Sequence, residues 1–253
     1  MKIYQAELHV HTVLSPCAGV EMIPPLIVQQ ALQAGLNLIA ITDHNASENV
    51  AAVIAAAKGE DLAVLPGMEL QTEEEVHSLC LFDTLDQLNA LQKVVNDALP
   101  DTPNNVEFFG EQFIVDETGD YIRRKDELLI NNTRLSLEEA FRVVTDLGGL
   151  FIPAHVNRQA FGLIYHLGFV PPDLDLQAIE ISRHITPDKA LTTYPQLAHY
   201  PLIQSGDVHY LADFLGVNQF LMAEPSIAEI KKAFRGQDGR WFRLHPPLDN
   251  SPA

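Results

Sequence analysis

The sequence is poor in cysteine, and it has no hydrophobic run long enough to cross a membrane. Cys17 and Cys80 are its two cysteines, so a framework of disulfides is not expected and a reducing compartment is favoured. A membrane helix needs about 20 apolar residues, and Met1-Lys2-Ile3 leads directly into a strand-like segment. We therefore predict a cytoplasmic protein with no signal peptide and no membrane anchor.

Basic residues are scarce as well. The chain has 16 Lys and Arg against 34 Asp and Glu, a formal net charge of −18. Proteins that bind long nucleic acids use Lys and Arg to neutralise phosphates, and no basic stripe is visible here. We expect no long nucleic acid as a partner. A small phosphorylated substrate remains possible, because bound metal ions would supply local positive charge.

What the sequence does contain is an alternation of strand-like and helical segments over 253 residues, 47% of them hydrophobic. This length suits one α/β domain covering residues 1–253, or at most two small ones. Alternating strands and helices with short connections predict a parallel sheet, and seven strands indicate a closed or nearly closed barrel. Strands are predicted over 2–11, 36–42, 62–70, 76–82, 149–155, 176–182 and 201–207. Helices are predicted over 24–34, 47–59 with Ser47 as N-cap, 85–99, 136–147 with a capping box of Ser136 and Glu139, and 226–236.

The segment of about 99–135 interrupts this alternation. It is polar and rich in turn residues. One interpretation is a surface excursion that contains a small hairpin through Gly119-Asp120. The other is an inserted loop or lid that serves a site, as long ordered loops often do.

Potential metal ligands recur beside the apolar runs. His9 and His11 are two residues apart on a strand, so both side chains project from one face. A barrel of parallel strands gathers residues from many strand ends onto one face. Imidazole, carboxylate and thiolate bind divalent transition metals. The nine candidates are His9, His11, Cys17, His44, Glu69, His77, His155, Asp207 and His209.

At these residues the chain resembles the PHP family, named after polymerases and histidinol phosphatase. The matching blocks are LHVHT, ITDHN, PAH and SGDVH, with the Glu and the His between the second and the third. The resemblance extends from Glu7 to about Tyr210. It implies a distorted (β/α)7 TIM-like barrel that holds two or three divalent ions (Zn, Mn or Fe) at the C-terminal ends of the strands.

The resemblance also implies a division of the ligands among the ions. The first ion would be bound by His9, His11, Glu69 and Asp207, and the second by Glu69, His77 and His155. The third would be bound by His44, His209 and a residue after the first strand. Pro16 stands there in place of an aspartate found in many members, and Cys17 follows it. Either Cys17 supplies a thiolate, which would favour Zn or Fe over Mn, or the third site is weak.

Four further residues are candidates for supporting roles. Asp43 would sit behind the cluster and orient a ligand. Arg158 and Arg183 lie where a phosphate clamp would be expected, because the planar guanidinium matches phosphate, although surface arginines are common. His184 could protonate the leaving group, as could a metal-bound water or an aspartate of the cluster.

The predicted function is a metal-dependent phosphoesterase that acts on a small phosphomonoester or nucleotide. A hydroxide bridging the ions, held through Glu69 and Asp207 among the ligands, would attack phosphorus in line. The alternatives are a phosphodiesterase or exonuclease on short oligonucleotides, and a non-catalytic metal-binding regulatory module. The sequence selects neither the physiological substrate nor the native metal nor the oligomeric state.

Overall fold

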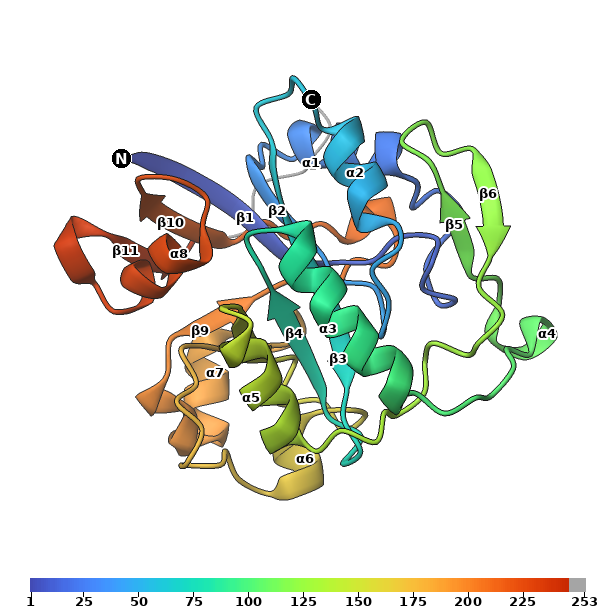
Figure 1. The fold of residues 1–253 in the computed structure, drawn as a ribbon. Coiled ribbons are helices and arrows are strands. Elements are labelled where there is room, and N and C mark those ends of the chain that lie inside the picture. Colours follow the sequence, from blue (N-terminus) through green and yellow to red (C-terminus); the bar gives the residue numbers. More distant parts are fainter. Residues whose placement is uncertain (246–253) are drawn as a thin grey trace.

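A curled seven-stranded sheet, which forms half of a barrel, organises the mixed α/β fold (Figure 1). The computed structural model describes residues 1–245, and the end of the predicted domain lies outside them. The order across the sheet is β11-β10-β1-β2-β3-β4-β7. These strands are β1 (Lys2–Val10), β2 (Leu38–Ile41), β3 (Ala63–Gln71), β4 (His77–Leu81), β7 (Leu150–Pro153), β10 (Asn218–Met222) and β11 (Trp241–Leu244). Two smaller sheets contain β5 (Phe113–Val115) with β6 (Tyr121–Arg124), and β8 (Ile179–Ile181) with β9 (Leu202–Gln204).

All seven predicted strands are present, but the prediction of an all-parallel barrel is wrong. β1, β2 and β3 are parallel to one another, whereas β4 is antiparallel to both β3 and β7. Residues 72–76, which join β3 to β4, are too few for the crossover that parallel neighbours need. On the other side of the sheet β10 pairs antiparallel with β1, a strand that the sequence did not indicate.

The predicted helices are found with small shifts at their ends. They are α1 (Pro24–Gln33), α2 (Val50–Ala56), α3 (Leu85–Ala98), α5 (Leu137–Asp146) and α8 (Ile227–Phe234). The capping box of Ser136 and Glu139 is present at α5. Ser47 does not cap α2; its hydroxyl donates to Oε1 of Gln92 at 2.8 Å, and the helix begins later. Additional short helices are α4 (Val106–Phe109), α6 (Leu163–Leu167) and α7 (Pro187–Thr193).

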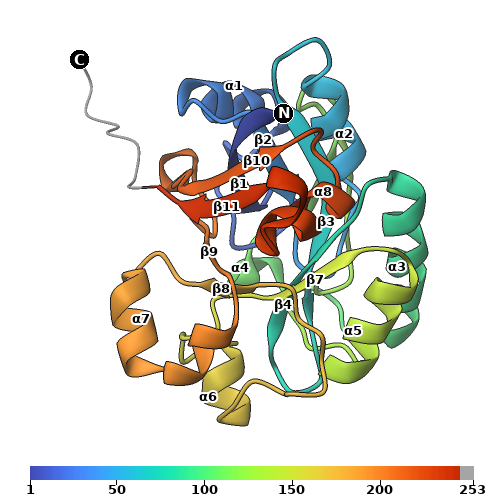
Figure 2. The ribbon, with the colours of Figure 1, turned by 90° about the vertical axis from the view of Figure 1, so that its left-hand side faces the viewer.

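The central strands are buried on both faces, as the continuous apolar run of β2 predicts. Leu38 and Ala40 belong to a core cluster on one side of the sheet. Ile39 and Ile41 belong to the larger cluster on the other side, under α1, α2 and α3. Figure 2 shows α8 beside β10 and β11, where it closes the first cluster. The sheet is therefore a rigid base, and the edge at which β1, β2 and β3 end is held in place.

The segment 99–135 is ordered and tied to that edge. Its β5–β6 hairpin turns through Gly119, as predicted. Asn49 fixes it from the body of the protein: its amide donates to the Phe113 carbonyl, and its oxygen accepts from the Val115 N–H, both at 3.0 Å. Asn45 donates to the carbonyls of Leu129 and Asn131 at 2.8 Å. Two asparagines near the ends of β2 and α2 thus anchor this segment.

The helices give no indication of a membrane span. Among the residues that the structure describes, no helix combines the length and the apolar character needed to cross a bilayer.

Candidate metal centre

The predicted ligands lie together at one edge of the sheet. His9 is on β1, Glu69 is on β3, and His155 follows β7. His77 is the first residue of β4, not one near its end. Because β4 is antiparallel to β3, its beginning lies at the same edge as the other ligands. The reversed strand therefore brings His77 to the cluster. Six of the nine predicted ligands are buried, and the other three, Asp207, His209 and Cys17, are partly or fully exposed.

Glu69 is at the centre of the cluster, and its two oxygens contact different histidines. Its Oε1 lies 3.2 Å from Nε2 of His9, 2.9 Å from Nδ1 of His77 and 3.1 Å from Nε2 of His155. Its Oε2 lies 2.9 Å from Nδ1 of His44 and 3.4 Å from Nε2 of His11. A carboxylate placed in this way can join two ions.

Asp207 completes one side of the cluster. Its Oδ1 lies 3.3 Å from Nε2 of His9 and 3.4 Å from Nε2 of His11. Three groups have all their ligand atoms within 4.8 Å of one another: His9, His11, Glu69 and Asp207; His44, Glu69 and His77; and His11, His44 and His209. The first is the set predicted for the first ion. The other two differ from the predicted sets, since they do not contain His155 or Cys17.

The donor atoms fit divalent metal ions. The Nε2 atoms of His9 and His11 are 3.1 Å apart, and at most one proton can lie between them. Burial lowers the pKa of His11 far below its ordinary value, and His209 and His44 lower it further. Burial also opposes the charged form of His9, yet the Glu69 and Glu180 carboxylates raise its pKa well above the ordinary value. A compact set of imidazoles and carboxylates is the usual environment of transition metals.

Buried polar atoms without partners support the same fit. Within residues 1–245, they include Nδ1 of His44, Oε2 of Glu69 and Oδ1 of Asp207. Buried polar atoms are normally hydrogen-bonded. These three atoms belong to the cluster, where a divalent cation would satisfy them.

The Glu180 carboxylate lies behind the cluster and orients the imidazole of His9. Nδ1 of His9 lies 3.1 Å from Oε1 of Glu180, which also accepts from the N–H of His155 at 3.1 Å. When Nδ1 of His9 donates its proton to Glu180, the lone pair of His9 is on Nε2, which faces the cluster. Sequence reasoning missed Glu180. The available signal was a carboxylate between two isoleucines in a strand expected to be buried.

His11 is held by a relay of hydrogen bonds. Its Nδ1 lies 2.9 Å from Oγ of Ser15, and this hydroxyl donates to Oδ1 of Asp43 at 2.7 Å. Asp43 also accepts from the N–H and hydroxyl of Thr12, both at 2.7 Å. Asp43 thus lies behind the cluster and acts on its ligand through Ser15, another residue that the sequence did not single out.

Cys17 lies at the outer side of the cluster. Its Sγ is 3.1 Å from Nε2 of His209. Burial alone would raise the pKa of this thiol, but His44 and His209 lower it to about 6. A thiolate at this position is chemically suited to bind a metal. Cys80, by contrast, is fully buried in the core.

The backbone is strained at several points of the site. Non-glycine residues with positive φ include Asn45 (48°), His155 (31°), Phe161 (61°) and Asp207 (50°). Such conformations cost about 1–3 kcal/mol each and cluster at functional sites. Two of these four residues are candidate ligands.

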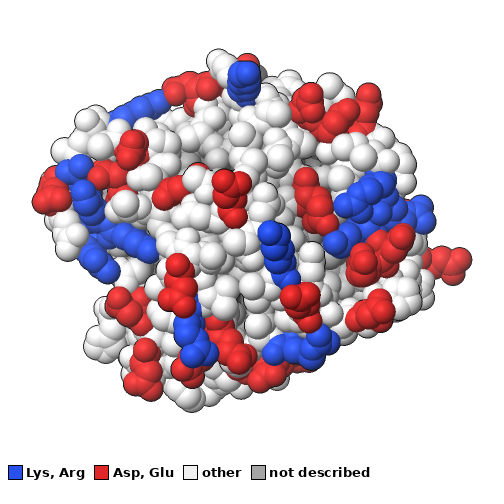
Figure 3. Space-filling view, in the orientation of Figure 1, with Lys and Arg blue, Asp and Glu red and all other residues white. Residues whose placement is uncertain are grey.

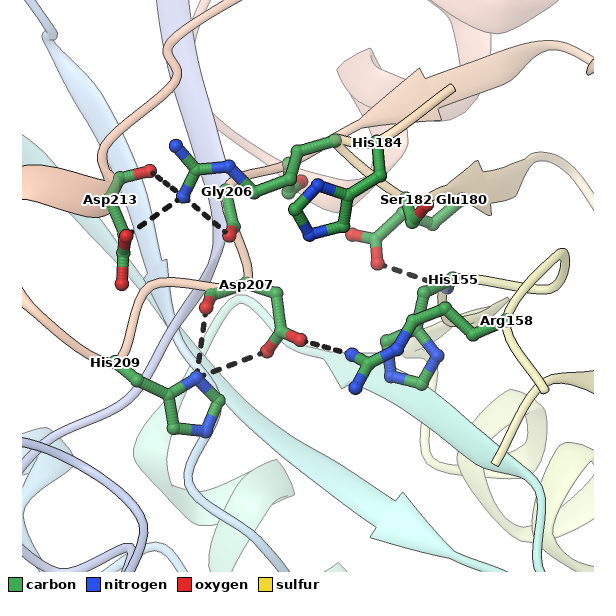
Figure 4. A pocket seen from close by; sticks show the side chains of 11 residues that line it. His155, Arg158, Glu180, Ser182, His184, Gly206, Asp207, His209 and Asp213 are labelled. Atoms are coloured by element: carbon green, nitrogen blue, oxygen red, sulfur yellow. Dashed lines mark hydrogen bonds and ion pairs between the residues drawn. The ribbon is translucent and has the colours of Figure 1, made fainter. Parts of the chain in front are cut away.

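Two cavities flank the cluster. The polar cavity, of about 610 Å³, is shown in Figure 4. It is lined by His155, Arg158, Glu180, Ser182, Arg183, His184, Ser205, Gly206, Asp207, His209 and Asp213. The apolar cavity, of about 350 Å³, adds Phe109, Ile130, Phe161 and Gln71 to the ligands Cys17, His44, Glu69 and His77. His155, Arg158, Asp207 and His209 line both cavities. Phe109 and Ile130 belong to the segment 99–135, so this segment lines the apolar cavity.

The three residues expected near a phosphate line the polar cavity but differ in their contacts. Arg158 donates to Oδ2 of Asp207 at 2.5 Å (Figure 4). Arg183 donates instead to the carbonyls of Gly206 and Asp213 and to Oδ1 of Asp213, at 3.0–3.3 Å. His184 is exposed at the cavity wall. Arg158 is therefore the arginine that contacts the cluster, whereas Arg183 holds the loop after β9.

Comparison with known proteins adds a family and a fold. The model of the PHP domain matches residues 7–152. No curated protein sequence matches the chain. The lesion-specific endonuclease EndoQ from Pyrococcus furiosus has a similar structure, with a TM-score of 0.76 and 21% identity over 98% of this chain and 60% of that one.

Two other solved structures are similar. Endonuclease Q in complex with a 27-mer duplex that carries an abasic lesion has a TM-score of 0.70 and 21% identity, over 95% of this chain and 58% of that one. A metal-dependent phosphoesterase, described as putative, from Bifidobacterium adolescentis has a TM-score of 0.54 and 19% identity, over 81% and 87%. The chain thus spans about three fifths of the length of the endonucleases. At these identities the similarity concerns the fold.

Proposed function

The chain belongs to the PHP domain family, and on that premise we propose that it is a metal-dependent phosphoesterase. The proposal places two or three divalent ions (Zn, Mn or Fe) among the nine predicted ligands, within a single domain with an insertion at about 99–135. The observation that carries it is Glu69, whose two oxygens contact separate groups of buried histidines. Such ions would polarise a phosphoryl oxygen and activate water for attack on phosphorus.

The surrounding residues would set the geometry of this reaction. Glu180 and the Asp43–Ser15 pair would keep the imidazoles of His9 and His11 in fixed orientations. Arg158, whose side chain is 38% exposed, has further N–H groups that can bind a phosphoryl oxygen in the polar cavity. His184, on the wall of the same cavity, is our candidate proton donor to the leaving group.

A small phosphomonoester or a nucleotide is the proposed substrate. The net charge of −18 disfavours a long polyanion. On the face shown in Figure 3, most Lys and Arg gather in two groups, at the left and at the right, each bordered by Asp and Glu, and no stripe of them crosses the face. A small anion needs only the positive charge of the centre and of Arg158.

Cleavage of short oligonucleotides is the second candidate. The segment 99–135 carries exposed aromatic and basic side chains together: Phe108 is 77% and Tyr121 63% exposed, and Arg123 and Arg124 are on β6. Aromatic platforms with nearby cations are common in proteins that bind single strands. This candidate would make the protein a phosphodiesterase at the same centre.

Hydrolysis of p-nitrophenyl phosphate and of bis(p-nitrophenyl) phosphate by the metal-loaded protein tests the proposal. We expect turnover of at least one ester, its loss with a chelator and its return with Zn²⁺, Mn²⁺ or Fe²⁺. Faster hydrolysis of the monoester favours the first candidate, and faster hydrolysis of the diester favours the second. No hydrolysis of either ester with any of the three metals would overturn the phosphoesterase proposal.

A further inference from the structure

The apolar cavity has a composition that the chemistry at phosphorus does not require. Its volume of about 350 Å³ falls within the range of about 300–1,000 Å³ typical of small-molecule sites. One side is the candidate metal centre, and the other is formed by Phe109, Ile130 and Phe161. A phosphoryl group gains nothing from such walls, so they point to a different part of the substrate.

Besides the candidate ligands and Arg158, whose guanidinium contacts Asp207, the polar residue of this cavity is Gln71. It is the last residue of β3, two positions beyond Glu69, so its side chain projects from the same face of the strand. The residue is 6% exposed. Its backbone is fully engaged: the N–H donates to Asn45 and the carbonyl accepts from Thr133. Its side-chain amide makes no hydrogen bond to residues 1–245 and is not among the fully buried polar atoms, so it is open to the cavity.

An amide that is open to a cavity is hydrogen-bonded to water before a ligand enters, and a ligand that displaces this water must replace those hydrogen bonds. A ligand does so when it supplies both an acceptor and a donor to the amide. Gln71 therefore offers an amide without a protein partner to a ligand-sized space beside the candidate metal centre.

The aromatic wall is held in place. The ring of Phe161 stacks on His77, with centroids 4.3 Å apart and planes within 5°. The carbonyl of Phe161 accepts from the N–H of His77 at 3.1 Å, and its φ of 61° is strained for a non-glycine residue. The chain thus maintains an unfavourable conformation that places a flat apolar ring next to a candidate ligand.

We infer that the apolar cavity binds a nucleobase of the substrate, with the base ring against Phe161 and Phe109 and its edge hydrogen-bonded to Gln71. This inference rests on the proposed function and names its substrate class: phosphoesters that carry a nucleobase. Every nucleobase has a flat face that stacks on aromatic side chains. Each also has an edge with hydrogen-bonding groups that an amide can pair with. An aliphatic group would leave Gln71 unsatisfied, and a sugar would leave most of its hydroxyls against apolar walls.

The nucleobase can come from a free nucleotide or from a strand whose base is turned out of the stack. The cavity would bind the same chemical group in both cases. The two sources differ in what lies on the other side of the phosphate, so separate substrates distinguish them.

The first measurement is kinetic and compares Gln71→Leu with Gln29→Leu, the same change on the exposed side of α1. The quantity is kcat/KM for the best of the nucleoside 5′-monophosphates divided by kcat/KM for ribose 5-phosphate. We expect this ratio to exceed ten in the native protein. In Gln71→Leu it should fall about tenfold, the value of one neutral hydrogen bond, and in Gln29→Leu it should not change.

A second measurement does not depend on catalysis. Saturation-transfer NMR with free nucleosides and chelator-treated protein should show binding that Gln71→Leu weakens and ribose does not reproduce. In a parallel kinetic series, a strand of ten nucleotides replaces the mononucleotide. If the strand is cleaved, the mononucleotide is not, and Gln71→Leu slows the cleavage, the bound nucleobase comes from a base turned out of a strand.

The outcomes separate this inference from the proposed function. Nucleoside binding without any ester hydrolysis would support the cavity assignment and reject the phosphoesterase. The nucleobase site would be overturned by three results together: ester hydrolysis, a ratio of the two kcat/KM values near one in both variants, and no nucleoside binding. These results would leave the phosphoesterase proposal intact.

Discussion

The two cavities beside the candidate metal centre share four wall residues but differ in chemistry. The polar cavity is completed by Ser182, His184 and Ser205 near the ends of β8 and β9. The apolar cavity is completed by Phe109 and Ile130 from the insertion and by Phe161 from the loop after β7. One side therefore suits a charged group and water, and the other a flat, mostly uncharged group.

Under the proposed function, the cluster would carry out the reaction and the apolar cavity would determine the specificity. The ligands come from the sheet, whose strands are packed on both faces and leave little room for change. Phe109 and Ile130 of the apolar wall come from the segment 99–135, which is anchored through Asn45 and Asn49. We expect that replacing this segment alters the substrate preference while the cluster stays intact.

Removal of both His9 and His11 by replacement with alanine should have the largest effect. These residues belong to the group of four ligands within 4.8 Å of one another, so we expect loss of bound metal. Turnover of every phosphoester should fall about a thousandfold or more, because the ions supply most of the stabilisation of developing charge. Metal analysis and kinetics check this. Retained turnover would show that the cluster is not the catalyst.

Replacement of Arg158 by alanine tests the polar cavity. We expect kcat/KM to fall about a hundredfold, as for other charged contacts to a transition state. The loss should be equal for substrates with and without a nucleobase. Arg142→Ala, at an exposed position of α5, is the matched control. If kcat/KM falls only for nucleotides, Arg158 contributes to binding in the apolar cavity instead.

Replacement of Cys17 by alanine tests the outer side of the cluster. If the thiolate near His209 is a ligand, we expect about one ion fewer per chain and a weaker preference for Zn²⁺ over Mn²⁺. Elemental analysis after dialysis measures both quantities. Unchanged stoichiometry and preference would eliminate Cys17 as a ligand.

The smallest effect is expected far from both cavities, at Glu229. The Arg240 side chain, followed by the Ala223 N–H, lowers the pKa of Glu229 to about 2. A lowered pKa means that the ionised form stabilises the fold; this stabilisation is present above the ordinary value near 4.5 and is lost as the pH falls toward 2. Glu229→Gln should therefore lower Tm at pH 7 more than at pH 3.

In Glu229→Gln, the ratio of kcat/KM for nucleotides to kcat/KM for ribose 5-phosphate should not change. An equal shift of Tm at both pH values would contradict the assigned ion pair. A changed ratio would show that the two regions are coupled.

Much of the cluster could be predicted from the sequence because the candidate ligands lie in short motifs. The two-residue spacing of His9 and His11 and the apolar runs before His44 and His155 placed these side chains near strand ends. The direction of β4 did not follow, because the apolar run 76–82 looks the same in either orientation. β10 and β11 were missed because their pairing depends on contacts with β1, far away in the sequence.

The supporting residues were less predictable. Glu180, Ser15 and Gln71 become informative only through their neighbours: His9, His11 and the apolar cavity. A single carboxylate, hydroxyl or amide carries no motif. The strained φ of Phe161 is likewise set by tertiary packing against His77.

Anomalous X-ray scattering from crystals grown with Zn²⁺ or Mn²⁺ tests the central claim most directly, that the cluster around Glu69 is a multi-ion metal centre. We predict two or three peaks within coordination distance of the nine ligands, with neighbouring ions ~3.5–4 Å apart and Glu69 shared between two of them. Crystals with well-ordered Glu69, His9 and His155 but no anomalous peak beside them would contradict the account.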